Sequence, residues 1–490
     1  MTHLHHGLTR YDRLVKECLD RRALNDRPLP NTFGRLLPEN PVTGSLGDAT
    51  LIKAYDTLVD DMRTKKTGDG PADAGMTFFG QFVDHDITLD ATSAIGTKID
   101  PRTIRNIRTP NLDLDCVYGN GPDASPHLYS EKHEGFLLFG TKSNPRDLAR
   151  NDRGTALIGD PRNDENIIVS QIQGAFITLH NILMSHVQEG GDTAKDVRDC
   201  AGMGVRQAVW EQMVTPKLRN FEEVRRFVRL HYQWLVLNQL LPAFVDAAWL
   251  KKALPGHLFG PDAPIMPVEF SGAAYRFGHA TVVSDYVLKA GAEPVDLFKI
   301  QGFGHRPADA DLEMGQFFST PGSTAQKAQP VNPNMAATLF KLPFVTSGIK
   351  LGETDVTPDQ AAKLGLRNIL RDRYALHLPS GQQVARHLGI DEIPAPEALR
   401  SHGISKTPLW FYCLHEAGAN GKNRLTGVGA AIVGTVFGRL LAFDDESVIH
   451  LHDFTPWAGF GGADCTMGGV MAFVEKHRGD VAHADDLKSG

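Results

Sequence analysis

The stretch from Asn166 to Gln188 constrains the fold most, because its apolar side chains recur at the spacing of a long helix with a buried face. The positions that share this spacing are Ile168, Ile172, Phe176, Leu179, Leu183 and Val187. Recurrence at the helical period is typical of an α-helix packed in a core. A similar pattern predicts a second helix from Glu222 to Leu241, whose end the pair Leu241-Pro242 should mark.

Helical patterns also occur elsewhere, whereas strand-like alternation is scarce. We expect a helix around 76–90 and further helices at about 312–320, 332–340, 358–373, 381–387, 407–416 and 425–441. Residues 1 to about 75 are polar and rich in turn formers, and the stretch that follows the first helix, through residue 155, should form long loops. No period of 20–50 residues recurs, which excludes a solenoid or propeller. The predicted class is mainly α, with little β.

Length and composition limit the possible classes of protein. With 490 residues, the chain should form two domains or one unusually large core. Its formal charge of -7 gives no reason to propose a nucleic-acid partner. The N-terminus has no recognisable signal peptide and no stretch is long enough to span a membrane, while the odd number of cysteines and the lack of a CxxC pair fit a reduced compartment. We therefore expect a protein that is cytoplasmic or exported by a non-classical route; its oligomeric state stays open.

The run from Gly80 to Asp86 gathers an amide, an imidazole and two carboxylates on about two helical turns. The polar residues are Gln81, Asp84, His85 and Asp86, and apolar residues flank them on both sides. A charged patch on a surface helix would explain the run in isolation. A histidine in an apolar setting, however, can take a proton from a small substrate and return it, which heterolytic cleavage of a peroxide requires.

The segment from Ile158 to Asn166 places Arg162 at a turn just before the long helix. A guanidinium stabilises the charge that builds on a departing oxygen without changing its own protonation state. The alternative is a helix-capping loop, in which Asp164 and Glu165 favour the N-terminus of the helix.

The segments Ala274–Ala280 and Leu366–Arg373 contain the remaining candidates, His279 and Asn368. A neutral imidazole is a common axial ligand of haem iron, and the glycine before His279 would let the macrocycle approach the backbone. An asparagine side chain can accept the other N–H of a ligand histidine and raise its basicity. Taken alone, His279 also fits a core histidine with satisfied hydrogen bonds.

Together and in this order, these four segments resemble the peroxidase-cyclooxygenase superfamily, the animal-type haem peroxidases, and in particular its bacterial members. The resemblance covers roughly residues 30–450. It implies a mainly α fold with a single large helical haem-peroxidase domain at 31–450, an N-terminal arm at 1–30 and a C-terminal extension at 451–490. It also implies haem b as cofactor, with hydrogen peroxide and a small reducing co-substrate as partners.

The resemblance implies catalytic and iron-binding roles for the residues of these motifs. Gln81, His85 and Arg162 match the family's catalytic residues on the distal side of the haem. His279 matches the ligand of the haem iron, and Asn368 matches the hydrogen-bond partner of that ligand.

Further residues match positions that hold the haem in the family. Asp84 and Glu165 match the carboxylates that form esters with the haem, and the sequence leaves open whether these esters form here. Arg276 and Arg371 are candidates for binding the propionates. Asn166 stands where mammalian members with a sulfonium link have methionine, so that link cannot form.

A calcium site is also implied, because the residue after the distal histidine binds calcium in the family together with a loop. Residues 109–115 line up with that loop, and calcium prefers six to eight oxygen ligands. The expected ligands are Asp86, Thr109, Asn111, Asp113 and Asp115. The family usually has serine in place of Asp115, and an Asp-rich turn without metal is the alternative.

The resemblance predicts a haem peroxidase that reduces hydrogen peroxide and oxidises small phenolic donors, halides or thiocyanate through a ferryl species. A haem-dependent fatty-acid dioxygenase is the first alternative, but that branch has a radical-forming tyrosine where this chain has Arg276, and Tyr275 lies one step further away. The second alternative is a non-catalytic haem-binding or adhesion protein. Past Arg373 the chain is one residue longer than the family pattern, so no role is assigned there. We expect His180 to be a core histidine bonded to a neighbouring segment.

Overall fold

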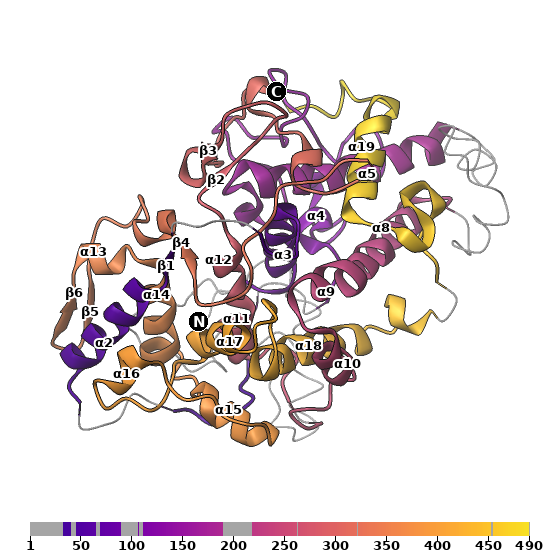
Figure 1. The fold of residues 1–490 in the computed structure, drawn as a ribbon. Helices are drawn as coiled ribbons and strands as arrows, with labels where there is room; N and C mark the ends of the chain where they lie inside the picture. Colours follow the sequence, from indigo (N-terminus) through magenta and orange to yellow (C-terminus); the bar gives the residue numbers. More distant parts are fainter. Residues whose placement is uncertain are drawn as a thin grey trace, which may run out of the picture.

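The computed structural model describes residues 33–40, 46–64, 69–89, 106, 111–189, 218–261, 263–320, 322–451 and 454–489. Helices dominate these residues (Figure 1). The α-helices of the described residues are α2 (Asp48–Asp61), α3 (Ala74–Ile87), α4 (Asp115–Tyr118), α5 (Ile167–Glu189), α8 (Phe221–Leu235), α9 (Leu241–Phe244), α10 (Ala247–Ala253), α11 (Val268–Ser271), α12 (Gly278–Thr281), α13 (Pro358–Ala361), α14 (Leu364–Leu370), α15 (Gly381–Leu388), α16 (Glu397–Arg400), α17 (Leu409–Ala419), α18 (Gly427–Ala442) and α19 (Met467–His477).

The described β-structure consists of three short two-stranded sheets. Within the described residues, the strands are β1 (Arg63–Thr64), β2 (Asp285–Tyr286), β3 (Val295–Asp296), β4 (Met335–Ala336), β5 (Ile349–Leu351) and β6 (Thr354–Val356). β1 pairs with β4 in parallel, whereas β2–β3 and β5–β6 are antiparallel. The mainly α class predicted from the sequence is confirmed.

The helices α3, α5 and α8 meet at an aromatic cluster near the centre of the molecule (Figure 1). The rings of Phe82 and Phe176 stack with their centroids 5.1 Å apart, and Tyr232 packs edge-on against Phe82 at 6.1 Å. All three side chains are at most 2% exposed. Offset and edge-to-face aromatic pairs add to the stabilisation from burial, so this cluster fixes α3 against its neighbours.

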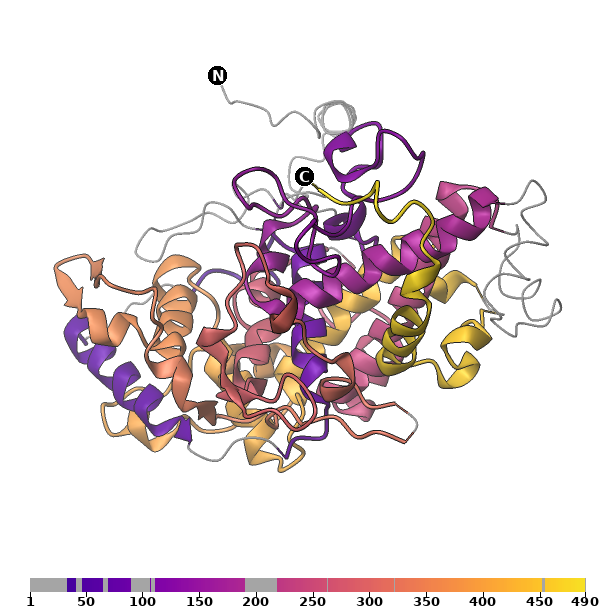
Figure 2. The same ribbon diagram turned by 90° about the horizontal axis from the view of Figure 1, so that it is seen from above.

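The C-terminal helix α19 packs along α5, and the chain end lies beside the loops of residues 130–150 (Figure 2). An isolated bridge pairs Thr141 with Ser489. His231 on α8 also holds the C-terminal region, because its Nδ1 donates to the Phe227 carbonyl at 2.8 Å and its Nε2 accepts from the Trp457 amide at 2.8 Å.

The long helices lie where the sequence predicted them, but several shorter expectations were wrong. The stretch 312–320 forms only a 3-10 turn at Met314–Gln316, because its backbone bonds instead to the start of α3; Gly75 N donates to the Phe317 carbonyl at 2.9 Å. The stretch 332–340 holds β4 and a 3-10 turn, since Met335 N donates to the Met62 carbonyl across the strand pair at 2.8 Å.

Two helices differ from the predicted ones in their ends. The second long helix does not stop at Pro242, because a π-helical segment at Val236–Leu240 leads into α9, where the proline occupies the first turn and its missing N–H does no harm. The predicted helix at 358–373 is divided into α13, α14 and a π segment at Arg371–Ala375. The turn-rich stretch before residue 75 contains α2, whose apolar face is buried.

Among the described residues, α5 is the one helix long and apolar enough to cross a membrane. In its apolar window, 89% of the residues are buried inside the protein. The expectation for His180, on this helix, is confirmed: the ring bonds to the Gly135 carbonyl at 2.9 Å and to the Tyr118 hydroxyl at 3.2 Å.

Candidate active site

α3 presents His85 from a buried position. The imidazole is 5% exposed, and its Nδ1 lies 2.8 Å from Oδ1 of Asn163. No residue in the described part of the chain bonds to its Nε2. Burial, together with the nearby Arg162 guanidinium, lowers the pKa of His85 to about 4. The side chain is therefore a neutral imidazole at neutral pH, able to accept a proton at Nε2.

Arg162 lies beside His85 in a 3-10 turn (Pro161–Asp164) that precedes α5. Asp160 begins this turn: its Oδ1 accepts from the Arg162 amide at 2.8 Å, and its Oδ2 binds Nη2 of the guanidinium at 2.7 Å. The same Nη2 donates to the carbonyls of Thr88 and His85 at the end of α3. The guanidinium is thus fixed in orientation through Nη2 and Nε, while Nη1 has no partner among the described residues.

Glu165 and Gln81 contact each other directly. Nε2 of Gln81 donates to the Glu165 carboxylate, and the Asn166 amide reaches Oε1 of Gln81 at 3.4 Å. Burial raises the pKa of Glu165, opposed by the hydrogen bond from Gln81. The structure thus brings together the amide and the carboxylate that the sequence placed on different segments.

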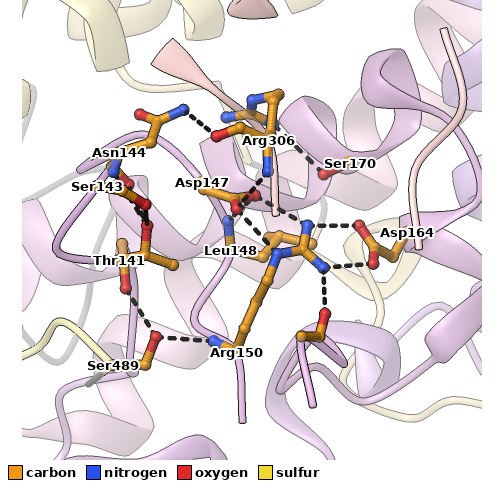
Figure 3. A network of polar contacts seen from close by, with 12 residues as sticks. Thr141, Ser143, Asn144, Asp147, Leu148, Arg150, Asp164, Ser170, Arg306 and Ser489 are labelled. Atoms are coloured by element: carbon orange, nitrogen blue, oxygen red, sulfur yellow. Dashed lines mark hydrogen bonds and ion pairs between the residues drawn. The ribbon is translucent and has the colours of Figure 1, made fainter. Parts of the chain in front are cut away.

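A buried ion network holds the turn from behind (Figure 3). The Arg150 guanidinium binds Asp164 through two hydrogen bonds, of 2.6 and 2.9 Å, and Asp147 through two more, of 2.8 and 2.9 Å. These three side chains are at most 4% exposed. Charge-assisted bidentate pairs of this kind fix geometry strongly, so the network fixes the backbone between Arg162 and Glu165.

A cavity opens between α3 and the segment that carries His279. Three arginines and one carboxylate line it: Arg162, Arg276, Arg371 and Asp84. Its remaining lining residues are Phe33, Thr88, Val268, Ser271, Gly272 and Leu376. Arg276 is oriented by a hydrogen bond from Nε to the Ser271 carbonyl, 2.9 Å long. Such a cluster of cations can bind carboxylate groups of a ligand.

His279 lies on α12, one residue after Gly278. The Asn368 side-chain amide of α14 contacts its Nδ1 at 2.9 Å, and a half-turn of that amide presents its oxygen to an Nδ1–H. Burial, together with Arg276 and Arg371, lowers the pKa of His279 to about 3. The ring is therefore neutral, and its Nε2 has no partner among the described residues.

Asp86 points away from this cavity, into the loop before α4. Its carboxylate accepts from the amides of Leu114 at 3.2 Å and Cys116 at 3.5 Å, and from the Tyr232 hydroxyl at 3.0 Å. Leu114 has a left-handed backbone conformation (φ 61°), which turns the loop around the carboxylate. Burial and the nearby Asp113 raise the pKa of Asp86 to about 7.

Three carboxylates converge at this loop. Asp86, Asp113 and Asp115 each offer an oxygen, and these oxygens lie within 4.8 Å of one another. Asn111 lies in the bend that leads into the loop, and Thr109 lies outside the described residues. Hard oxygen donors at this spacing suit calcium, which also neutralises the mutual repulsion of the carboxylates.

Sequence reasoning missed Asn163, Asp160 and Tyr232, which orient His85, Arg162 and Asp86 respectively. Asn163 directly follows Arg162 in the sequence, and this position next to a candidate catalytic residue could have marked its buried amide as part of the site. Tyr232 belongs to the apolar pattern of α8, and its hydroxyl gave no sign in the sequence.

Comparisons with known proteins give a family match over part of the chain and a match in fold. A family model described as animal haem peroxidase matches residues 91–301, a stretch that includes Arg162 and His279. Among solved structures, peroxidase A from Dictyostelium discoideum has a TM-score of 0.60 at 14% identity and covers 92% of this chain and 94% of its own. The family match and the shared fold together support a place in the peroxidase-cyclooxygenase superfamily.

Other solved structures with the same fold are fatty acid alpha-dioxygenases. The enzyme of Oryza sativa, as a variant with palmitic acid, has a TM-score of 0.60 at 15% identity, with 94% of this chain and 83% of that chain covered. The enzyme of Arabidopsis thaliana has a TM-score of 0.58 at 14% identity, covering 94% and 78%. No curated protein sequence matches the chain. The family match therefore indicates an oxidoreductase with haem, without separating a peroxidase from a dioxygenase.

The residues around His279 fit a haem. His279 is a neutral imidazole whose Nε2 has no partner among the described residues. Apart from its chain neighbours and its own helix backbone, no described heavy atom lies within 4 Å of the point where a side chain on Gly278 would begin. The flanking Arg276 and Arg371 suit the propionates.

Proposed function

We propose that the chain is a haem peroxidase that reduces hydrogen peroxide with electrons from small phenolic donors, halides or thiocyanate. The observation that supports this most is the neutral, buried His85 with a free Nε2, next to an Arg162 held in place by Asp160. A base and a fixed cation are what heterolysis of an O–O bond needs.

His279 with Asn368, and Arg276 and Arg371, would hold the haem, which would supply a redox-active iron for the reduction of the peroxide. His85 Nε2 accepts the proton of the inner peroxide oxygen and delivers it to the outer oxygen, which leaves as water. Arg162 stabilises the charge that builds on that oxygen. With phenolic donors, two electrons and two further protons turn the remaining peroxide oxygen into a second water. A halide or thiocyanate instead supplies the two electrons by taking up that oxygen atom, with one proton, as its hypohalous or analogous acid.

Gln81, Asp84 and Glu165 have proposed roles next to this centre. Gln81 would position a halide or water, and its hydrogen bond to Glu165 keeps both groups on the same side of α3. Asp84 lines the cavity with the arginines, which supports an ester to the haem through this carboxylate. If esters form through Asp84 and Glu165, the haem should resist acid-acetone extraction after exposure to peroxide. Free extraction at that point would rule them out.

Calcium is proposed at the acidic loop, with Asp86, Asp113 and Asp115 as carboxylate ligands and with Thr109 and Asn111 as further ligands. The ion would join α3 to the loop directly behind His85. Protein treated with a chelator should lose thermal stability and recover it with one calcium ion per chain. Indifference to chelation would remove the site.

A fatty-acid dioxygenase is the second candidate, because the fold neighbours include such enzymes. Tyr275 argues against it: the side chain is buried, and its hydroxyl donates to the Gly80 carbonyl on α3 at 3.2 Å. A non-catalytic haem-binding protein would not need His85, Arg162 and Gln81 in one arrangement.

The test is a comparison of substrates with the purified, haem-loaded protein. We expect peroxide-dependent oxidation of at least one of bromide, chloride, thiocyanate and a phenol, and no oxygen uptake with an unsaturated fatty acid when peroxide is left out. Oxygen uptake without peroxide would replace the proposal with a dioxygenase. Full haem occupancy without either reaction would favour the non-catalytic alternative.

A further inference from the structure

The His85 side chain is the first member of a buried chain of hydrogen bonds that joins four elements: α3, the 3-10 turn Pro161–Asp164, α5 and α4. Its Nδ1 contacts Oδ1 of Asn163 at 2.8 Å, and Nδ2 of Asn163 donates to Oε1 of Gln173 on α5 at 2.9 Å. Nε2 of Gln173 donates in turn to the Cys116 carbonyl, on α4, at 3.0 Å. Asn163, Gln173 and Cys116 are 0% exposed, so no solvent competes for these bonds.

The direction of every bond in this chain follows from its far end. A backbone carbonyl can only accept, so Gln173 must turn its NH2 group toward Cys116 and its oxygen toward Asn163. Asn163 must therefore present its NH2 group to Gln173 and its oxygen to His85. An amide oxygen only accepts, so Nδ1 of His85 must carry the proton. The neutral imidazole then has its lone pair on Nε2.

The Cys116 carbonyl is itself fixed. It also accepts from the Gly159 amide at 2.9 Å, and the peptide of Cys116 donates its own N–H toward Asp86. Gly159 packs so closely that a side chain begun there would lie 2.2 Å from the Asp115 carbonyl oxygen, so only glycine fits. The end of the chain that sets the polarity therefore cannot rotate away.

We propose that Asn163 and Gln173 are positioning residues that hold His85 in the Nδ1–H tautomer, with Nε2 free to accept a proton. The inference deepens the proposed peroxidase function, since this tautomer is the one that can act as a base toward a peroxide in the cavity. Neither residue contacts the cavity itself. Both act through His85.

Nitrogen NMR of the full chain with labelled imidazoles reads the tautomer directly, because protonated and bare ring nitrogens have well separated shifts. The His85 signals are assigned by their loss in His85→Gln, in the purified chain without haem and with diamagnetic zinc protoporphyrin. We expect a protonated Nδ1 and a bare Nε2 in the wild type. In Asn163→Leu and Gln173→Leu both tautomers should be populated. Gln81→Leu is the matched control: it removes an amide of the same site outside the relay, so the His85 tautomer should not change.

A second measurement connects the tautomer to turnover. Asn163→Leu and Gln173→Leu should lower kcat/KM for hydrogen peroxide by about 10- to 100-fold, part of the 10²–10⁴-fold that a positioned base contributes. KM for the electron donor should stay unchanged, since neither side chain lines the cavity. An Nε2–H tautomer in the wild type, or an unchanged single Nδ1–H tautomer in a folded Asn163→Leu, would overturn the proposal.

The outcome separates this inference from the proposed function. An Nδ1–H His85 in a wild type without peroxide turnover would leave the relay standing and remove the peroxidase. Peroxide turnover together with an Nε2–H His85 would support the peroxidase and overturn the role of the relay. Should neither leucine variant fold, the wild-type tautomer alone decides.

Discussion

The two sides of the cavity are built differently. On the distal side, which comprises α3, the turn 160–165 and the loop 111–118, every functional group has a partner that is itself held. His85 bonds to Asn163, which bonds to Gln173, and Arg162 is held by Asp160. On the proximal side, which comprises residues 274–281 and 364–375, His279 has one side-chain partner, Asn368.

The backbone follows the same division. The distal residues lie on the long helix α3 and on a turn fixed by the Arg150 network, both surrounded by buried side chains. The proximal histidine lies on a helix of four residues, with open space at Gly278, and α14 ends in a π segment at Arg371–Ala375. Groups that move protons need a geometry fixed in advance, whereas a metal ligand can be drawn into place by its metal.

Replacing the two histidines should give the largest and most different effects. His279→Ala should abolish haem binding and with it the Soret band, because no other described side chain offers an iron ligand in that position. His85→Ala should keep the Soret band and lose peroxide turnover by at least about 100-fold, since only the base is removed. Circular dichroism checks that both variants are folded. An intact Soret band and intact peroxide turnover in His279→Ala would remove both the haem assignment and the comparison.

Removing Arg150 tests whether the ion network fixes the distal turn. Arg150→Met leaves Asp147 and Asp164 buried without a counter-charge, which should cost about 3–5 kcal/mol in the free energy of unfolding. Denaturant titration measures this cost. Arg146→Met is the matched control, because the pair Arg146–Glu475 is exposed and worth about 0–1 kcal/mol. Equal costs for the two variants would show that the network does not stabilise the distal side.

Asp86 links stability to pH in a direction that calcium should reverse. Its pKa rises from 3.8 in the unfolded chain to about 7 in the folded protein, so the folded state binds the proton more tightly. With cations removed, this contribution is present below pH 4 and is lost as the pH rises through 7, with an upper bound of about 4 kcal/mol. The Asp86→Asn variant should not lose this stability as the pH rises.

Unfolding titrations at several pH values, with a chelator and with calcium, provide the measurement. The difference between wild type and Asp86→Asn isolates this carboxylate from all other titrating groups. In calcium the wild type should keep its stability up to neutral pH, because the ion pairs with the ionised form. A difference that does not depend on pH or on calcium would contradict the assignment of Asp86.

The sequence predicted the helices and the candidate residues of the distal side, but not the residues that hold them in place. The positions of α3 and α5 followed from apolar periodicity, and the conjunction of His85, Arg162, His279 and Asn368 followed from their order. The roles given to these residues stay predictions. The relay could not be predicted, because His85 and Cys116 lie 78 and 57 residues from their partners Asn163 and Gln173, and the last contact depends on how α4 packs on α5.

The predictions for the short elements were wrong for a related reason. Periodicity predicted helices at 312–320 and 332–340, yet tertiary hydrogen bonds to α3 and β1 determine the backbone there. Local pattern decides long segments that bury a whole face, whereas short segments take the conformation that satisfies their neighbours.

The two asparagines allow the smallest and most direct comparison of the two sides. In the haem-free protein, Asn163→Leu leaves the Nδ1–H of His85 and the Oε1 of Gln173 without their partner, at about 1–3 kcal/mol for each buried group. Asn368→Leu breaks one contact, to Nδ1 of His279, so a single buried group loses its partner and we expect about 1–3 kcal/mol in total. Denaturant unfolding of both variants measures the difference. Haem should widen the cost of Asn368→Leu, because the partner of an iron-binding imidazole matters only once the iron is bound; equal costs with and without haem would mean that the proximal side is as preorganised as the distal one.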